Sequence, residues 1–537
     1  MNSPLNSPVE QLLTSCGDTR LEIDPNTGHN RYHCSPRPSD AVPLGSCTSS
    51  TISRRGFDAA CDTLRTIRDS DDWFVAANGC ANSIRQRLSK LLTLPDGVDI
   101  ALAPSGTDVE LLALALAAGP GDRPVVNIVV GPTEVGSGTP LAAACCHYDR
   151  LTPGGSHVTA GEPVDRALAA RVDVRTVNLR TASGAMFSES EIDGAVVELV
   201  VEACEADAIV LLHIVAHSKT GVHAPSLSCV ERLRGISDDV VVVVDAAQGR
   251  FSRRGLREVL QKDYLVMFTG SKFYGGPPFS GALLVPTTFQ PLKRKLSSFP
   301  HGFRDYFSAA EMPETWPEIR QSMPAEPNLG AILRWSAAIA EIDAYYKVPE
   351  DARLGVLRFF EAEVPRILGD STATCLLPVF PPLFDDSSQR FLESKTTVFG
   401  FWVTPPGATR PLDNTALKQL HADLATDLSA THSNLDPQIV ARRYHVGQPV
   451  DLGSAGCVLR VALGGELITR VATDTSIGET LDQRLAWLRS QLVGLRQKID
   501  CLAKQHSPSC PSMPTLGTTP LAPLEQSQPI IGSFATM

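Results

Sequence analysis

The sequence predicts an α/β protein. Its larger part is expected to be a mostly parallel sheet of the seven-stranded type flanked by helices, followed by a smaller α+β domain. Between residues 59 and 285, helical segments alternate with short Val, Ile and Leu runs. Such runs are typical of parallel strands that are covered on both faces. After Pro286 the alternation ends, and two long helices precede two further strands. With 537 residues, 43% of them hydrophobic, the chain can form two or three packed domains.

The expected elements follow one another along the chain. In the larger domain, helices are predicted over 64–92, 109–118, 196–206 and 227–233. Strands are predicted over 125–130, 208–215, 240–244, 265–268 and 282–285. In the smaller domain, helices are predicted over 329–346 and 354–368, and strands over 397–403 and 457–463.

A last helix is predicted over 481–502, where apolar residues alternate four and three positions apart. Over about three heptads this spacing fits a coiled-coil seam. A helix that packs on its own domain produces the same spacing more often, and we favour that interpretation.

The two ends of the chain differ in composition from its middle. Residues 1–50 are rich in Pro, Ser, Asn and Cys and are predicted to form an irregular arm. A large cofactor-binding domain is expected over 51–300, and a small C-terminal domain with connecting helices over 301–503. Residues 504–537 are predicted to be a disordered tail, because the stretch from Gln505 onward has six prolines and a single charge, Glu525.

Composition excludes several classes of function. The net charge of −11 argues against nucleic acid as the main partner. No apolar run reaches the ~18 residues of a membrane helix. Residues 1–14 have neither the basic n-region nor the apolar h-region of a secretory signal, so none is expected there. The 13 cysteines include no CxxC pair, so we expect reduced thiols, a cytoplasmic location and no metal site.

The candidate chemistry lies at the ends of two neighbouring predicted strands. One strand ends at Asp245, and the next is followed by Lys272. In open α/β sheets ligands bind beyond the carboxyl ends of strands, so both side chains are expected in one crevice. A lysine amine forms a Schiff base with an aldehyde cofactor, and a buried carboxylate keeps a pyridine nitrogen protonated. Pyridoxal 5'-phosphate (PLP) is the cofactor that needs both groups together.

A phosphate cradle is expected directly before the helix at 109–118. Ser105, Gly106 and Thr107 supply hydroxyls, backbone N–H groups and a helix N-terminus. Asp108 fits poorly there, because its charge repels a phosphate unless the side chain turns away.

Each of these features has an ordinary structural explanation when taken alone. Asp245 is as often a helix cap, the turn before the helix is a common N-cap, and Lys272 is equally well a solvated loop lysine. Their order along the chain, with Asp245 and Lys272 each after a predicted strand, favours the joint functional interpretation.

The sequence resembles the fold-type I PLP enzymes, in particular the class V aminotransferase and cysteine desulfurase branch. The motifs that carry the resemblance are PSGT at 104–107, HSKTG at 217–221, VDAAQ at 244–248 and TGSK at 269–272. The resemblance spans roughly residues 49–502, and only these motifs are specific.

The resemblance implies a role for each matching residue. Lys272 would hold the cofactor, Asp245 would pair with its pyridine nitrogen, and Gln248 would contact its ring hydroxyl. The residues implied to hold the phosphate are Ser105, Gly106, Thr107 and Ser271. Those implied to approach the ring are His217 or Ser218.

Two residues near the C-terminal domain are candidates for the substrate. Arg460 matches the position where this branch usually binds the substrate carboxylate, a task that suits a guanidinium. Taken alone, a strand arginine is as often part of a structural ion pair. His445, expected in a loop over 442–455, is a candidate substrate contact or acid–base group.

Two departures from the branch stand out. The loop 131–139 lacks the ring that commonly stacks on the cofactor, which leaves Glu134, Val135 or the more distant His147 to cover it. A desulfurase needs a mobile thiol, but 442–455 contains no cysteine. Cys457 is expected to face away from Arg460, and Cys375 is expected in the core.

We therefore expect a PLP enzyme acting on a small amino acid or amine, with amino transfer as the favoured reaction. A β-lyase, including a carbon–sulfur lyase, is the alternative. An inactive cofactor-binding or interaction scaffold is the alternative of another class. The resemblance also implies a homodimer, although the counterpart of the turn that lends a threonine across its interface, 323–328, contains none.

Overall fold

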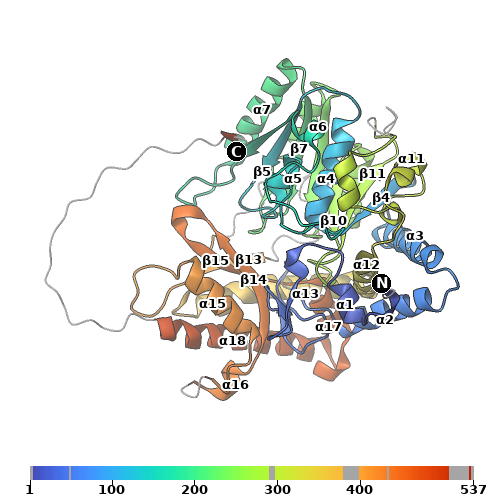
Figure 1. Cartoon of the computed structure of the whole chain (residues 1–537). Helices are drawn as coiled ribbons and strands as arrows, with labels where there is room; N and C mark the ends of the chain where they lie inside the picture. The colour runs from blue at the N-terminus through green and yellow to red at the C-terminus, as the bar shows by residue number, and fades with distance from the viewer. Residues whose placement is uncertain are drawn as a thin grey trace, which may run out of the picture.

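The structure is a computed structural model that describes residues 4–47, 50–289, 297–378, 398–431 and 435–506, and the backbone of 531–533. Two sheets and their helices make up most of it (Figure 1). Of the predicted tail 504–537, the described parts are a 3-10 turn at Lys504–His506 and a short strand, β16 (Ile531–Ser533). None of the described helices is long and apolar enough to cross a membrane.

The larger sheet is mostly parallel, as expected. Its order is β16-β6-β5-β7-β9-β10-β11-β4, with β8 paired to β7. The mutually parallel neighbours are β6 (Val172–Val177), β5 (Val125–Val130), β7 (Ile209–Ala216), β9 (Val240–Ala246) and β10 (Leu265–Thr269). The antiparallel pairs involve β11 (Gly281–Pro286) with both β10 and β4 (Val98–Ala103), β8 (His223–Ala224) with β7, and β16 with β6.

Strands β4 and β6 were not predicted from the sequence. Their sequences, VDIALA and VDVRTV, carry charged residues that interrupt the apolar runs on which the strand predictions depended. The predicted helix 64–92 is two helices, α2 (Arg54–Arg68) and α3 (Trp73–Leu92). They are separated because Asp72 caps α3, accepting from the N–H groups of Phe74 and Val75.

Helices cover both faces of the larger sheet. One face packs on α4 (Gly106–Ala118), together with α5 (Thr139–Ala143), α6 (Arg166–Ala169) and the segment around α11 (Pro317–Ser322). The other face packs on α3, α7 (Glu189–Glu205), α8 (Leu227–Arg234), α9 (Arg253–Gln261) and α12 (Leu329–Lys347). The apolar sequence of α4 is explained by its burial on nearly all sides.

Side chains of β9 alternate between these two cores. Val241 and Val243 belong to the core on the α4 side, and Val242 and Val244 belong to the opposite core. Because successive side chains of a strand point to opposite faces, Asp245 follows Val243 onto the α4 side. The strand pattern therefore decides which face the acid occupies.

The smaller sheet has the order β12-β13-β15-β14-β3. Its strands are β12 (Thr374–Leu376), β13 (Val398–Val403), β15 (Cys457–Ala462), β14 (Tyr444–Asp451) and β3 (Val42–Leu44). Its helices are α13 (Glu350–Gly369), α15 (Asn414–Ala425), α16 (Pro437–Val440), α17 (Gly465–Thr473) and α18 (Leu481–Ala503). Thr397, the first residue of a predicted strand, lies outside the described residues.

The N-terminal segment joins both parts of the molecule. It contains α1 (Val9–Leu13) and the small hairpin of β1 (Ile23–Asp24) and β2 (His29–Asn30). Strand β3 adds to the smaller sheet beside β14, in parallel register. In Figure 1 this segment, in dark blue, lies between the two sheets.

The C-terminal part confirms one expectation, for its last helix, and contradicts two others, for residues 442–455 and for Cys375. Helix α18 packs on α13, α15 and α17 of its own domain, which agrees with the favoured interpretation of its heptad spacing. The loop expected over 442–455 was wrong, because most of it forms β14. The core position expected for Cys375 was also wrong, because the residue is exposed on the short edge strand β12.

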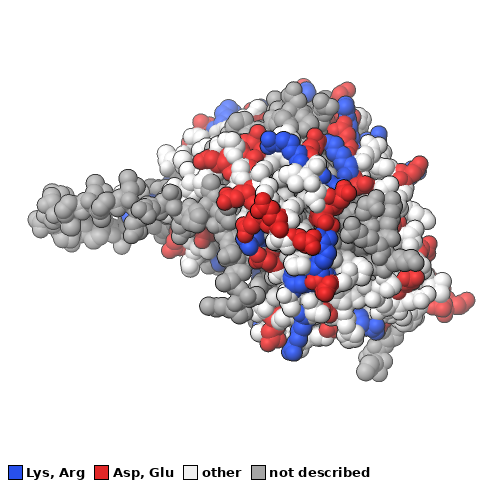
Figure 2. All heavy atoms as spheres, turned by 90° about the horizontal axis from the view of Figure 1, so that it is seen from above, with Lys and Arg blue, Asp and Glu red and all other residues white. Residues whose placement is uncertain are grey.

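On the face seen in Figure 2, acidic and basic side chains lie interspersed over the surface. This distribution accompanies an overall excess of acidic residues, 59 against 48 basic ones.

Candidate active site

A cavity of about 630 Å³ lies beyond the carboxyl ends of β9 and β10. Its volume is within the range typical of small-molecule sites. The cavity brings together residues from both sheets and from the N-terminal segment. The predicted site residues that line it are Ser105, Gly106, Thr107, His217, Asp245, Gln248, Ser271, Lys272 and Arg460. Ser218 and His445, also predicted, are not among its lining residues.

Asp245 and Lys272 reach the cavity from neighbouring strands. Asp245 in β9 is in register with Met267 in β10, and Lys272 follows three residues after β10 ends. Burial raises the pKa of Asp245, and the nearby Lys272 opposes that rise. Burial lowers the pKa of Lys272, and Asp245 again opposes the change. The two groups thus interact electrostatically inside one largely desolvated site.

The turn before α4 forms one wall of the cavity. Ser105 caps the helix, and its Oγ accepts from the N–H groups of Thr107 and Asp108 at 3.2 and 3.3 Å. Gly106 allows a close approach, because a Cβ at this position would lie 3.0 Å from Cγ2 of Thr269. The wall therefore presents two hydroxyls and the N-terminus of a 13-residue helix.

Asp108 does not point its charge into this cavity. Its Oδ1 accepts the phenolic proton of Tyr148, and its side chain is almost fully buried. Burial raises the pKa of Asp108 to about 6. The anticipated conflict with a bound anion is thereby reduced, because the carboxyl lies to the side of the turn and is easily protonated.

The HSKTG turn has two distinct parts. His217 lines the cavity, and its buried Nδ1 has no hydrogen-bond partner among the described residues. Burial, together with the positive charge of Arg250, lowers the pKa of His217 well below its usual value, so the ring is neutral. Ser218 instead donates to Oε2 of Glu134 at 2.6 Å and accepts from Val222 N at 3.0 Å.

Glu134 fixes this turn against the loop 131–139. Its Oε1 accepts from Nε of Arg180 at 2.7 Å, and its Oε2 accepts from Ser218 and Thr220. Glu134 and Val135 both line the cavity. His147, the third candidate for covering a cofactor ring, contacts the hydroxyl of Tyr306 at 2.7 Å and is not among the lining residues.

Arg460 of β15 lines the cavity and is almost fully buried. It donates to the carbonyl oxygens of Gln448 at 3.2 Å and of Lys219 at 3.3 Å, and no carboxylate among the described residues forms an ion pair with it. Burial lowers its pKa. The Lys219 side chain also lines the cavity, and burial, together with the charges of Arg460 and Lys272, lowers its pKa to about 8. A guanidinium without an acidic partner in a cavity favours an anionic ligand.

His445 is held away from this site. It is buried in β14, where its Nε2 contacts Oγ1 of Thr51 at 3.0 Å and its backbone pairs with Pro43 of β3. Burial lowers its pKa to about 4. Its contacts are those of a residue that joins β14 to the N-terminal segment.

A buried polar network lies on the α4 side of the sheet, below Asp245. His213 Nε2 lies 2.9 Å from Asn127 Oδ1 and 3.2 Å from Glu110 Oε1, and Asn127 donates to Glu110 at 3.0 Å. Burial opposes the charged form of His213, but Glu110 and Asp245 together raise its pKa above the usual value. The network places an imidazole whose protonated form is favoured on the same face as Asp245.

Sequence reasoning missed the part of the cavity that comes from the N-terminal segment. The lining residues from this segment are Arg20, Arg31, Tyr32, His33 and Cys47. The segment has no helical or strand periodicity, so no local pattern indicated which of its side chains face a site. Further lining residues that were missed are Lys219, Lys418, His421 and Gln448.

Neither a protein-family model nor a curated protein matches this sequence. Among solved structures, the chain is similar to the cystine C-S lyase C-DES in complex with its reaction product cysteine persulfide. The identity is 12%, the match covers 85% of this chain and 98% of that one, and the TM-score is 0.50.

Two further solved structures are similar over comparable lengths. A NifS-like protein has 14% identity, with 84% of this chain and 99% of that chain covered and a TM-score of 0.47. A phosphoserine aminotransferase from Cytophaga hutchinsonii has 13% identity, the same coverage and a TM-score of 0.45. At these identities a similar structure shows the fold and not the reaction. The conclusion about the fold rests on the cystine C-S lyase, which has the TM-score of 0.50. The chain has the PLP-transferase fold of type I, the fold that the cystine C-S lyase C-DES also adopts.

Proposed function

We propose that this protein binds PLP through Lys272 and catalyses amino transfer from a small amino acid or amine. The observation that carries the proposal is the presence of Lys272, Asp245 and the α4 turn in one cavity. The fold independently supports a ligand site at these strand ends.

The residues of the cavity fit this cofactor. Ser105, Thr107 and the N-terminus of α4 are suitable donors for a phosphate. Asp245 would lie at the pyridine nitrogen, and Gln248 would contact the ring hydroxyl. His217 is neutral and leaves a buried ring nitrogen without a partner among the described residues, which suits a residue packed against a flat ligand. When bound, PLP supplies an aldehyde that takes up the substrate amine and a ring that withdraws electrons from Cα.

The protein residues would then have separate tasks. Arg460 binds the substrate carboxylate and thereby orients the bonds at Cα. The Lys272 amine would take the proton from the substrate Cα and hold it at Nζ, and its lowered pKa would increase the fraction that is free to accept a proton. Asp245 holds a positive charge on the pyridine nitrogen through its carboxylate. An amino acid substrate would leave as an oxo acid whose new oxygen comes from water. A second oxo acid would then take up the amino group and release one water.

The test begins with cofactor binding by the purified full-length protein. Added PLP should give a yellow protein, and borohydride should attach the cofactor to Lys272, as located by peptide mass spectrometry. Lys272→Ala should lose this attachment, while Lys262→Ala, at an exposed surface ion pair, should retain it. A colourless protein that fails to bind PLP would favour the interaction scaffold instead.

The reaction itself is tested by screening amino donors. Conversion of bound PLP to the pyridoxamine form, with release of one oxo acid per site, supports amino transfer. Release of pyruvate and ammonia over many turnovers without that conversion supports elimination and rejects amino transfer.

A carbon–sulfur lyase is the second candidate, and Cys47 is the observation that favours it. Cys47 lines the cavity, near enough to Lys272 and Arg460 for electrostatic interaction with both. In such a reaction the sulfur of Cys47 would attack the sulfur of a cysteine substrate, so that an S–S bond forms as the C–S bond breaks. The electron pair of the broken bond would stay on the carbon, where a proton yields alanine. Cys47→Ser should abolish alanine formation from cysteine. Cys229→Ser, at a buried cysteine outside the cavity, is the control.

Homodimer formation and a cytoplasmic location remain predictions of the resemblance and composition. Light scattering of the purified holoenzyme measures the former, and fractionation of cells measures the latter.

A further inference from the structure

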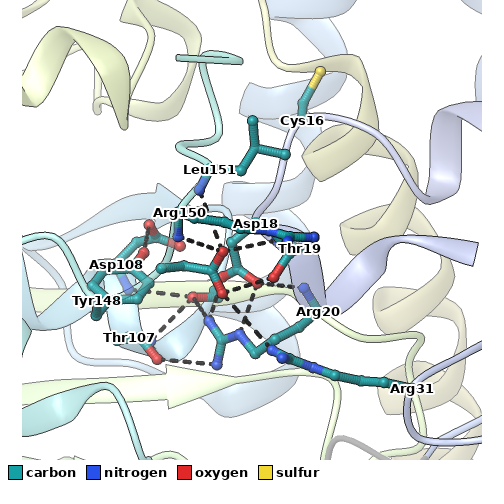
Figure 3. Close-up of polar contacts among 12 residues, drawn as sticks. Cys16, Asp18, Thr19, Arg20, Arg31, Thr107, Asp108, Tyr148, Arg150 and Leu151 are labelled. Carbon is teal, nitrogen blue, oxygen red and sulfur yellow. Dashed lines mark hydrogen bonds and ion pairs between the residues drawn. The ribbon is translucent and has the colours of Figure 1, made fainter. Parts of the chain in front are cut away.

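Arg20 belongs to the N-terminal segment but lies at the cavity, beside the α4 turn (Figure 3). It sits in a 3-10 turn, Thr19–Leu21, whose first N–H groups are capped by Asp18. The Arg20 side chain is only 12% exposed. A long cation so deeply placed needs partners on all sides.

Asp18 holds the guanidinium in a two-point ion pair. Nε of Arg20 donates to Oδ1 at 2.8 Å, and Nη2 donates to Oδ2 at 2.5 Å. The carboxylate is itself fixed, because Oδ1 also accepts from the backbone N–H of Arg20 at 2.9 Å. The guanidinium carbon lies 4.3 Å from the centroid of the Phe279 ring, which adds a cation–π contact. Arg20 is therefore presented in a single orientation.

The free edge of the guanidinium faces the two hydroxyls of the α4 turn. Nη1 lies 3.4 Å from Oγ1 of Thr107, and Nη2 lies 3.5 Å from Oγ of Ser105. These distances are at the long end for hydrogen bonds. An arginine has five N–H donors, and Asp18 occupies two of them. Arg20 thus retains donors that lie next to the helix N-terminus and the two hydroxyls.

The charges in this corner favour a bound anion. The ion pair with Asp18 cancels one charge, while the helix N-terminus adds partial positive charge. The carboxyl of Asp108, at the first turn of α4, accepts from Tyr148, and Asp108 is not among the residues that line the cavity. A buried arginine–carboxylate pair contributes little to stability by itself. The role of Asp18 is therefore better explained by its holding the Arg20 guanidinium in place.

We infer that Arg20 binds the phosphate of the cofactor, with Asp18 as its positioning residue, and that Arg20 makes the site selective for the phosphorylated over the unphosphorylated cofactor. The N-terminal segment is then part of the cofactor site within one chain. This inference rests on the proposed function, which places PLP in this cavity.

The test compares two ligands that differ only in the phosphate. Binding of PLP and of pyridoxal to the cofactor-free full-length protein is measured by absorbance titration. Arg20→Met retains an unbranched stem over Phe279, and Arg20→Lys retains the charge. In Arg20→Met the dissociation constant for PLP should rise by about 10- to 100-fold, while that for pyridoxal changes by less than about 3-fold. Arg20→Lys should recover part of the loss.

Arg150→Ala is the matched control, since Arg150 lies in the same region of Figure 3 but is 72% exposed and pairs with Glu22 outside the cavity. It should leave both dissociation constants unchanged. Equal losses for both ligands in Arg20→Met and Arg20→Lys, or no loss for either ligand, would overturn the role of Arg20. If the unsubstituted protein binds neither ligand, the proposed function itself fails, and that result is distinct from the first two.

Discussion

Tyr148 donates its phenolic proton to Asp108 at the first turn of α4, beside the wall of the cavity. This contact holds the carboxyl of Asp108 beside the turn that we propose to bind a phosphate. Because Asp108 is almost fully buried, its carboxyl is stabilised more easily in the protonated form. The free energy of unfolding is therefore expected to depend on pH through Asp108.

Asp108→Asn should stabilise the protein increasingly as pH rises. Burial raises the pKa of Asp108 from 3.8 to about 6. An acid whose pKa is raised by folding lowers the free energy of unfolding as pH rises from about 4 to about 6, by at most ~3 kcal/mol in total. The asparagine remains neutral and still accepts from Tyr148. Denaturant unfolding of the cofactor-free protein at pH 5 and pH 8 measures the difference, and a gain independent of pH would contradict the prediction.

Glu134→Gln should destabilise the fold strongly. The change removes the charge that pairs with Arg180, whose side chain is 8% exposed, while Glu134 is 1% exposed. Breaking a buried pair typically costs ~3–5 kcal/mol in the free energy of unfolding.

The matched control for Glu134 is Glu22→Gln. Glu22 pairs with Arg150 at 3.0 Å, but both side chains are more than half exposed. Such a pair contributes about 1 kcal/mol or less. Denaturant unfolding of the two variants should differ accordingly, and equal losses would show that the burial of Glu134 has no energetic consequence.

Asp245→Asn should slow the reaction without preventing cofactor attachment. Lys272 is unchanged, so borohydride should still fix PLP in this variant. The loss of the carboxylate removes the charge that keeps the pyridine nitrogen protonated. We expect kcat to fall by ~100-fold or more, the size of effect usual for a misplaced proton at a catalytic site. Single-turnover conversion of an amino donor measures it, and a variant with unchanged kcat would remove Asp245 from the mechanism.

Arg460→Ala should affect substrates according to their carboxylate. A charge-assisted hydrogen bond contributes about 1.5–3 kcal/mol, so losing the guanidinium should raise KM for an amino acid by ~10- to 100-fold. An amine of the same length without a carboxylate should show little change. Equal effects on both substrates would instead indicate that Arg460 stabilises β15 through its contacts with Gln448 and Lys219.

The sequence alone predicted five strands of the larger sheet, β5, β7, β9, β10 and β11, and the positions of Asp245 and Lys272 at two of their ends. Continuous apolar runs predicted the buried parallel strands, and Asp245 and Lys272 follow two such runs. Since carboxyl ends of neighbouring parallel strands meet at one edge, local pattern was sufficient to bring these side chains together. The turn at 105–107 was predicted from its position directly before an apolar helix, although the strand that precedes it, β4, was not predicted.

Only the tertiary structure decided what closes the cavity. Arg20 and Cys47 lie in a segment without periodicity, and their positions depend on packing against Phe279 and on the pairing of β3 with β14. His445 was expected near the substrate, but that same pairing buries it beside Thr51. Contacts between segments hundreds of residues apart leave no local pattern in the chain, because they arise from long-range packing rather than from the periodicity of a helix or strand.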